Sequence, residues 1–195
     1  MTKEKVLAKP VVFNSTNQRA ESAYRYGLLF LNNIFSTLSA GNTSISMMLF
    51  DMNDLYELFI YRVLRMIHGN KVLYQKRGNY LLERHSDHKK YIGLRPDITI
   101  KKDSGLIDIV DTKWKIPKSF AKESDAYQMN AYSSSIKGVQ RVILLYPLVQ
   151  KERIVDDYDF MDLNGKKRPL CIRTVDLMKM MNWKDFINEV KGVLV

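Results

Sequence analysis

Apolar residues recur at helical spacing in four parts of the chain. The first pattern predicts a helix over residues 19–38, which follows an extended lead over residues 1–16 and would end at the Gly-Asn pair 41–42. The second predicts a helix over residues 52–67, with a buried stripe formed by Leu55, Phe59, Val63 and Met66. Two more helices are expected over residues 124–136 and 183–193.

Short apolar segments between turn residues predict the strands. Residues 71–75 and 80–83 are expected to pair with each other. Residues 95–101 and 106–114 flank the tight-turn sequence Lys-Asp-Ser-Gly, so they predict an antiparallel hairpin. The remaining strands are expected at residues 141–146, 158–163 and 170–174, the last two joined by an Asn-Gly turn.

The order of these elements indicates an α/β fold with a mixed β-sheet flanked by helices. We expect the sheet and its helices to occupy residues 51–195 as one compact unit. The lead and the first helix would form an N-terminal helical extension over residues 1–50. A chain of 195 residues is long enough to bury a substantial core.

Composition and charge indicate the kind of partner. Hydrophobic residues make up 46% of the chain, which excludes intrinsic disorder. The net charge of +10 favours a polyanion, with nucleic acid ahead of an anionic membrane. Cys171 is the single cysteine, so no internal disulfide can form, and no apolar run approaches the ~20 residues of a membrane span. We therefore expect a cytoplasmic protein.

The hairpin around residues 102–105 carries the residues with the clearest chemistry. Alternating side chains put Asp111 and Lys113 on one face of their strand, ~7 Å apart, with Asp97 near the start of the paired strand. Two carboxylates held together repel each other unless a cation lies between them, and oxygen ligands suit Mg²⁺ or Mn²⁺. An ammonium group beside such an ion can orient a water and offset charge on a phosphoryl transition state. Metal-assisted phosphodiester hydrolysis requires these groups.

The Asp-x-Lys spacing is short and common. The alternative to a catalytic site is therefore that Asp111 and Lys113 form a surface ion pair on an edge strand and that Asp97 is a turn residue. Against that alternative, Pro96 directly precedes Asp97, and Trp114 together with the Ile109-Val110 pair implies a buried strand. On the helix expected downstream, Gln128 and Tyr132 are four residues apart and share a face that could reach a phosphate or the lysine.

Arg95-Pro96-Asp97 and Asp111-Thr112-Lys113 resemble the core motif of the PD-(D/E)XK nuclease superfamily, and the Gln-x-x-x-Tyr helix resembles its RecB-like branch. A closer resemblance is to McrC, the nuclease subunit of the modified-cytosine-dependent restriction system. The matching segments cover roughly residues 20–150 and comprise Met52–Phe59, residues 111–115, Asp125–Tyr132 and residues 144–147.

The resemblance implies a restriction-endonuclease-like fold and a role for each matching residue. Asp97 and Asp111 would bind Mg²⁺ or Mn²⁺, with the Thr112 carbonyl as a third ligand. Lys113 would be the catalytic lysine, supported by the helix pair Gln128 and Tyr132. Glu57 would be the further acidic ligand from the first core helix, and a solvated helix carboxylate is the alternative for it.

The resemblance also implies a Mg²⁺-dependent DNA endonuclease that serves as the cleavage module of a restriction complex. An AAA+ GTPase motor would supply specificity and activation, and a dimer would serve double-strand cleavage. McrC-like proteins carry a long N-terminal region that docks onto the motor, so the resemblance concerns the nuclease domain only. The alternatives are a RecB- or Cas4-like exonuclease without an iron–sulfur cluster, since a cluster needs four cysteines, and an inert DNA-binding or assembly subunit.

Basic residues around the helix at 52–67 and the strands after it are candidates for phosphate contacts. Such contacts would give a salt-sensitive, sequence-independent affinity for DNA. Nothing in the sequence resembles a base-reading helix, so target choice is expected to come from a partner. The candidates are Arg62, Arg65, Lys71, Lys76, Arg77, Lys89, Lys90, Arg95 and Lys115.

Three other groups of residues are weaker candidates for chemistry. His85 and His88 lack further ligands for a zinc site. Cys171 has no neighbouring base that would make it a nucleophile. The remaining group does not have the spacing of a calcium loop and is expected on a charged strand; it comprises Asp156, Asp157, Asp159 and Asp162.

Overall fold

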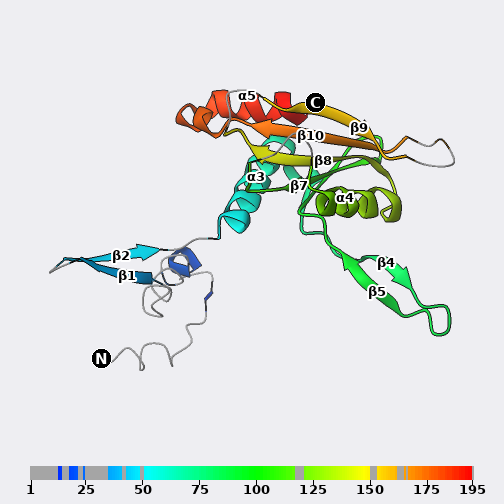
Figure 1. Cartoon of the computed structure of the whole chain (residues 1–195), viewed down its shortest axis with the longest axis horizontal. Coiled ribbons are helices and arrows are strands. Elements are labelled where there is room, and N and C mark those ends of the chain that lie inside the picture. The colour runs from blue at the N-terminus through cyan, green and yellow to red at the C-terminus, as the bar shows by residue number, and fades with distance from the viewer. Residues whose placement is uncertain are drawn as a thin grey trace. The chain divides into compact units, whose positions relative to one another are not determined.

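The computed structural model describes residues 13–14, 18–21, 24, 35–40, 43–48, 51–116, 121–149, 153–161, 165 and 167–194 (Figure 1). The chain forms two units, Met1–Asp51 and Met52–Val195. Within the described residues, no helix has the length and apolar character needed to cross a membrane.

The first unit contains a β-hairpin where a helix was expected. Strands β1 (Phe35–Ala40) and β2 (Thr43–Met48) pair antiparallel, after the short 3₁₀ helix η1 (Gln18–Ala20). The predicted helix over residues 19–38 is therefore wrong for residues 35–38, and most of its remaining length lies outside the described residues. A Gly-Asn pair suits a two-residue hairpin loop as well as a helix end, and β-branched residues on both sides of it favour strands.

Helix α3 (Met52–His68) confirms the second predicted helix, and the chain turns at Gly69, whose φ is 61°. The short 3₁₀ helix η2 (Gly69–Lys71) follows. The predicted stripe is wrong at Leu55 and Met66, which are 45% and 58% exposed. An apolar helix offers more than one stripe, and the sheet covers the one formed by Tyr56, Ile60, Val63 and Leu64.

Six strands form the central sheet in the order β3-β6-β7-β8-β10-β9. Strands β7, β8 and β10 run parallel in its centre, and antiparallel strands complete both edges. The bounds are β3 (Val72–Tyr74), β6 (Ile98–Lys101), β7 (Ile107–Thr112), β8 (Val139–Pro147), β9 (Val155–Asp159) and β10 (Pro169–Val175).

The antiparallel pairing of β6 with β7 confirms the hairpin predicted around residues 102–105, where Gly105 takes a φ of 81°. The predicted pairing of residues 71–75 with 80–83 is wrong. Strand β3 pairs with β6, which buries Val72 opposite Ile100. Strands β4 (Asn79–Glu83) and β5 (Lys90–Leu94) form a separate two-stranded sheet. Burial against the central sheet thus outweighed proximity along the chain.

Helices cover both faces of the sheet (Figure 1). Helix α4 (Glu123–Ser135) connects β7 to β8 and packs on one face, while α3 and α5 (Trp183–Leu194) pack on the other. The 3₁₀ helix η3 (Leu177–Met181) leads from β10 into α5. The helices predicted at 124–136 and 183–193 are confirmed. The late hairpin is confirmed as the antiparallel pair β9–β10, but its first strand is Val155–Asp159, so the predicted strand at 158–163 is wrong at residues 160–161, and residues 162–163 lie outside the described residues. The fold is therefore α/β, with a mixed sheet flanked by helices.

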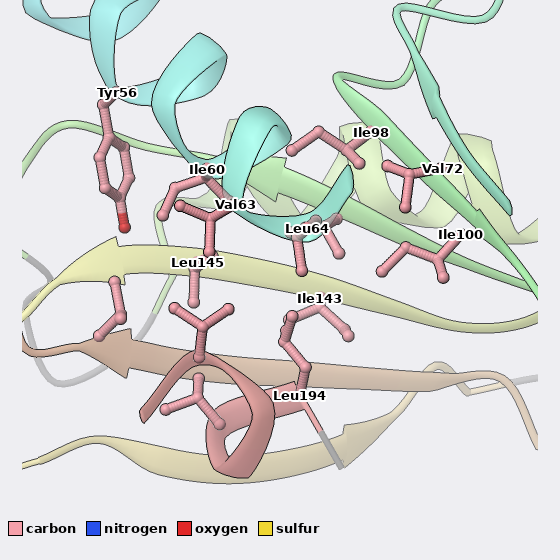
Figure 2. Packing of buried hydrophobic residues seen from close by; sticks show 14 of the residues in the cluster. Tyr56, Ile60, Val63, Leu64, Val72, Ile98, Ile100, Ile143, Leu145 and Leu194 are labelled. Atoms are coloured by element: carbon pink, nitrogen blue, oxygen red, sulfur yellow. The ribbon is translucent and has the colours of Figure 1, made fainter. Parts of the chain in front are cut away.

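Strand residues alternate between two apolar cores. Val110 faces the core shared with α3 and α5, whereas Ile109 faces the core under α4. Figure 2 shows the first core, where apolar residues of α3 lie against the strands. Asp111 has the same parity as Ile109, so its side chain lies on the α4 side of the sheet.

Candidate active site

The β6–β7 hairpin places the two predicted acidic residues opposite each other. Asp97 immediately precedes the pair formed by Ile98 and Val110, so its neighbour in the register is Asp111. The Thr112 backbone N–H donates to Asp97 Oδ2 over 2.8 Å, and the Thr112 hydroxyl donates to the same oxygen over 3.2 Å. These bonds hold the Asp97 carboxylate at the end of β7, beside Asp111.

Asp111 is fully buried, with 0% of its surface exposed. Its Oδ2 lies 2.5 Å from Lys113 Nζ, and its Oδ1 has no hydrogen-bond partner among the described residues. An unsatisfied carboxylate oxygen inside a fold is costly, on the order of 1–3 kcal/mol or more. A cation or a hydrogen-bond donor bound at Oδ1 would remove that cost.

Burial and the neighbouring Asp111 raise the pKa of Asp97 to about 7, against an ordinary value of 3.8. Burial likewise raises the pKa of Asp111, although Lys113 acts in the opposite direction. Burial alone would lower the pKa of Lys113, but the adjacent Asp111 outweighs this effect and the pKa is raised. The lysine is therefore protonated at neutral pH, while the carboxylate pair ionises reluctantly.

Helix α4 supplies the predicted supporting pair. Lys113 Nζ donates to Gln128 Oε1 over 3.2 Å, and Gln128 Nε2 donates to the Tyr132 hydroxyl over 2.9 Å. The Tyr132 hydroxyl donates in turn to the Arg95 carbonyl over 3.2 Å. This chain of hydrogen bonds fixes the direction of the ammonium group and ties it to the backbone just before Asp97.

Glu57 of α3 is buried beside the site, with 9% of its surface exposed. Gln75 Nε2 donates to Glu57 Oε1 over 2.9 Å, and the Gln75 backbone N–H donates to the Asp97 carbonyl over 2.8 Å. The charge of Glu57 contributes to the raised pKa values of Asp97 and Asp111. Gln75 thus joins Glu57 to the site, a role that the sequence analysis missed because β3 was assigned the wrong partner.

A second polar group beside the site was also missed. Asp125, in the first turn of α4, is buried, forms an ion pair with Lys115 and is hydrogen-bonded to the Tyr146 hydroxyl. Its charge also raises the pKa of Asp111. Lys115, predicted to contact DNA, is half-buried in this ion pair. In the sequence, Asp125 stands out only as an acidic residue at the start of a helix, which is common, and as the first residue of the Asp125–Tyr132 segment.

The donor set suits a divalent cation that keeps several of its waters. Asp97 and Asp111 offer carboxylate oxygens, and carboxylate and carbonyl oxygens are the ligands of Mg²⁺ and Mn²⁺. Within the described parts of the chain, no three His, Cys, Asp or Glu side chains are gathered closely enough to hold a metal ion by themselves. The residues therefore fit Mg²⁺ bound through two carboxylates, and they do not fit a structural zinc site.

The predicted DNA contacts lie in three surroundings. One set is exposed on or beside the β4–β5 hairpin and comprises Lys76, Arg77, Lys89, Lys90 and Arg95. Arg62 is exposed on α3. Two further candidates are exposed but already have partners in the protein. Arg65 donates hydrogen bonds to Tyr61 and Asn70, and Lys71 pairs with Asp103 over 2.7 Å.

Some of the weaker candidates make contacts within the fold. His88 Nδ1 lies 2.8 Å from Glu83 Oε1, and neither His85 nor His88 belongs to a metal-binding group within the described residues. On β9, Asp157 pairs with Arg173, while Asp162 lies outside the described residues. Burial raises the pKa of the Cys171 thiol to about 11, which disfavours the reactive thiolate at neutral pH.

Comparison with known families identifies the chain. The sequence profile described as McrBC 5-methylcytosine restriction system component matches residues 2–147. The chain belongs to this family. The resemblance inferred from the motifs is thereby confirmed for the McrBC system.

A solved structure is similar to this McrBC-family chain. It is the refined half-complex from the tetradecameric assembly of Thermococcus gammatolerans McrB AAA+ hexamers with bound McrC. The two chains are 18% identical with a TM-score of 0.57, and the match covers 94% of this chain and 40% of that chain. At this identity the likeness shows the fold. A search of curated proteins found no match.

Proposed function

We propose that this McrBC-family chain is a DNA-cleaving component, a Mg²⁺-dependent endonuclease with a PD-(D/E)XK core. The observation that carries the proposal is the position of Asp97 opposite Asp111, with Lys113 Nζ 2.5 Å from Asp111 Oδ2. A buried carboxylate pair is expensive in a merely structural role, because each charge has lost its water. A shared divalent ion removes that cost and explains the arrangement.

Each residue of the site has a task in this chemistry. Asp97 and Asp111 would hold the metal, and Thr112 orients the Asp97 carboxylate through two hydrogen bonds. Bound Mg²⁺ would supply Lewis acidity and lower the pKa of a coordinated water. Lys113, directed by Gln128, would place a fixed positive charge beside the phosphate, where charge develops in the transition state.

Glu57 would complete the site from α3. Gln75 holds its Oε1, and Gln75 also bonds to the Asp97 backbone. Glu57 does not form a three-carboxylate cluster with Asp97 and Asp111, but it is near enough for its charge to act on both, and it could accept a hydrogen bond from a coordinated water. The same neighbourhood disfavours binding of free phosphate without a cation, so cleavage would depend on the metal.

We also infer that the chain works with an AAA+ GTPase motor. The similar Thermococcus gammatolerans chain comes from an assembly of McrB AAA+ hexamers with bound McrC, and the present chain corresponds to 40% of that chain. Such a motor would supply target choice and activation. Co-purification of the chain with an McrB-like protein, with and without GTP, tests this part.

Asp111→Asn tests the nuclease proposal. With Mg²⁺ and supercoiled plasmid, in the presence of the motor partner, we expect the wild-type chain to cut and the variant to lose cutting. The thermal melting and far-ultraviolet circular dichroism of the variant should show an intact fold.

Asp103→Asn is the matched control, since Asp103 is an exposed acidic residue in the turn of the same hairpin. Nicking by Asp111→Asn at the wild-type rate would reject the assignment. Cleavage of linear but not circular DNA would favour an exonuclease. No cleavage by the wild type, with or without Mg²⁺, would favour an assembly subunit.

A further inference from the structure

The β4–β5 hairpin is an arm attached directly to the candidate active site. The chain leaves β3 at Gln75, whose φ is 43°, and enters β4 through Gly78, whose φ is 105°. It returns from β5 through Arg95 to Asp97. Figure 1 shows the hairpin extending away from the six-stranded sheet. Both ends of the arm therefore join residues that surround the carboxylate pair.

Only the base of this arm is packed in the protein. Leu94 belongs to the core under α4, whereas residues 80–93 are all exposed. The exposed residues include large apolar side chains, among them Leu82 at 54% and Ile92 at 58%. A two-stranded ribbon that is bare on both faces is marginal by itself, and contiguous exposed apolar surface is typical of a binding surface.

The charge of the arm favours a polyanion. Lys and Arg occur six times between residues 76 and 95, against two acidic residues. Both acidic residues are paired inside the arm, Asp87 with Arg84 and Glu83 with His88. Within the part of the chain that the structure describes, no acidic residue pairs with the remaining cations, which are Lys76, Arg77, Lys89, Lys90 and Arg95.

Two of these cations lie over aromatic rings. Lys89 Nζ lies 5.8 Å from the ring centroid of Tyr91, and Lys90 Nζ lies 5.7 Å from that of Tyr80. An ammonium group over a ring is attracted to the ring while its hydrogens remain free to donate. The two lysines thus lie over tyrosine rings on the exposed surface of the ribbon, where their ammonium groups are available to a phosphate.

Ile92 gives the arm an irregular backbone. Its φ is 55°, a left-handed conformation that a β-branched residue rarely adopts, and Ile92 is not paired with Leu81, although the register of the ribbon is the same on both sides of it. Strained backbone is concentrated at functional sites, where the surrounding structure maintains it. A twisted two-stranded ribbon can enter the major groove of DNA, which is ~12 Å wide.

We propose that the β4–β5 arm grips the DNA duplex beside the phosphate that is to be cut, with its unpaired cations on neighbouring phosphates. The inference deepens the proposed function and rests on its claim that the chain acts on DNA. Five strand residues at ~3.3 Å each span ~17 Å, which corresponds to about five phosphates of one strand at 3.4 Å per step. Along this span the unpaired cations lie at both ends: Lys89 and Lys90 at the tip of the arm, and Lys76, Arg77 and Arg95 at its base.

The test compares two double variants of the full chain with the same change in net charge. Lys89→Gln/Lys90→Gln removes the two cations over the tyrosines, and Lys137→Gln/Lys191→Gln removes two exposed lysines elsewhere. Lys137 lies just before β8, which starts beside Ile107, at the end of β7 away from Asp111. Binding of a fluorescent DNA duplex is measured at several salt concentrations without divalent ions.

Log affinity falls as log salt rises, and each phosphate contact contributes about 0.9 to the steepness of that fall. The arm variant should therefore make the slope less steep by about 1.8. The control variant should leave the slope unchanged, and the melting temperature of both should stay at the wild-type value. A slope unchanged in the arm variant, equal changes in both variants, or no salt-dependent binding by the wild type would each overturn the proposal.

A protein partner is the competing occupant of the arm. If the arm variant binds DNA normally but fails to bind an McrB-like partner, the arm belongs to that interface and the DNA assignment is wrong. The binding assay contains no divalent ion and scores no cleavage. Its result is therefore independent of whether the Asp111→Asn experiment supports the nuclease.

Discussion

The carboxylate pair makes the stability of the metal-free protein depend on pH. Burial and the charge of Asp111 raise the pKa of Asp97 in the folded state to about 7, against 3.8 as the ordinary value. Because the folded-state pKa is the higher one, the protonated carboxyl stabilises the fold below pH ~4, and this contribution is lost as the pH rises through 7. Three units of pKa correspond to about 4 kcal/mol, at 1.36 kcal/mol per unit.

Urea unfolding of the wild type and of Asp97→Asn, both in a chelator, measures this effect. The variant has no titrating group at position 97, so the difference between the two free energies of unfolding reports the titration of Asp97 together with its effect on Asp111. Relative to the variant, the wild type should lose about 3 kcal/mol of unfolding free energy between pH 5 and pH 8. This is the share of the total of about 4 kcal/mol that falls in this pH range. Asp103→Asn, at an exposed site, should show no such trend.

Mn²⁺ should reverse the trend, because the ion binds the ionised carboxylates and displaces the proton from Asp97. Its affinity for the wild type should rise about tenfold per pH unit below pH 7 and level off above it. Isothermal titration calorimetry in buffers of different ionisation enthalpy would report both the affinity and the released proton. An Mn²⁺ affinity that is equal at pH 5.5 and pH 8 would refute the idea that the two carboxylates share one ion. A pH-independent difference in stability between the wild type and Asp97→Asn in the chelator would refute the raised pKa of Asp97.

Two further predictions concern the groups around the pair. Lys113→Met should lower the single-turnover cleavage rate by about 10²–10³-fold while Mn²⁺ still binds, because the fixed charge beside the phosphate is lost; a rate within a few-fold of the wild type would contradict the catalytic role. Tyr132→Phe removes the hydroxyl that links Gln128 to the Arg95 carbonyl, so the free energy of unfolding should fall by about 1–2 kcal/mol in urea titration. If this variant is as stable as the wild type, the hydrogen bonds of the Tyr132 hydroxyl contribute nothing to the free energy of unfolding.

Local features of the sequence were enough to predict the arrangement around Asp97, Asp111 and Lys113. A tight-turn sequence fixes which two segments form the hairpin, and the period of two along a strand then places Asp111 and Lys113 on one face. The helix pair Gln128 and Tyr132 follows from a spacing of four residues. All of these relations act over short distances along the chain, so the pattern of residues contains them.

Other parts of the fold depend on contacts between distant segments. Strand β3 is followed by β4 in the sequence but pairs with β6, because that partner buries Val72 in the central sheet. The same choice between possible partners for burial leaves β4 and β5 as a separate arm and determines which stripe of α3 is covered. It also places Gln75 beside Glu57. A pattern of apolar residues shows that a surface will be covered, but it does not show by which segment.

The chain's residues on their own establish the α/β class, the McrBC family motifs and the identity of the acidic and basic side chains, since these depend on spacing and chemical type. Folding adds the environment of those side chains. The pKa of Asp97, the burial of Asp111 and the exposure of the β4–β5 arm arise from how much water the surrounding elements exclude. That exclusion is a property of many segments packed together, and no single stretch of the chain contains it.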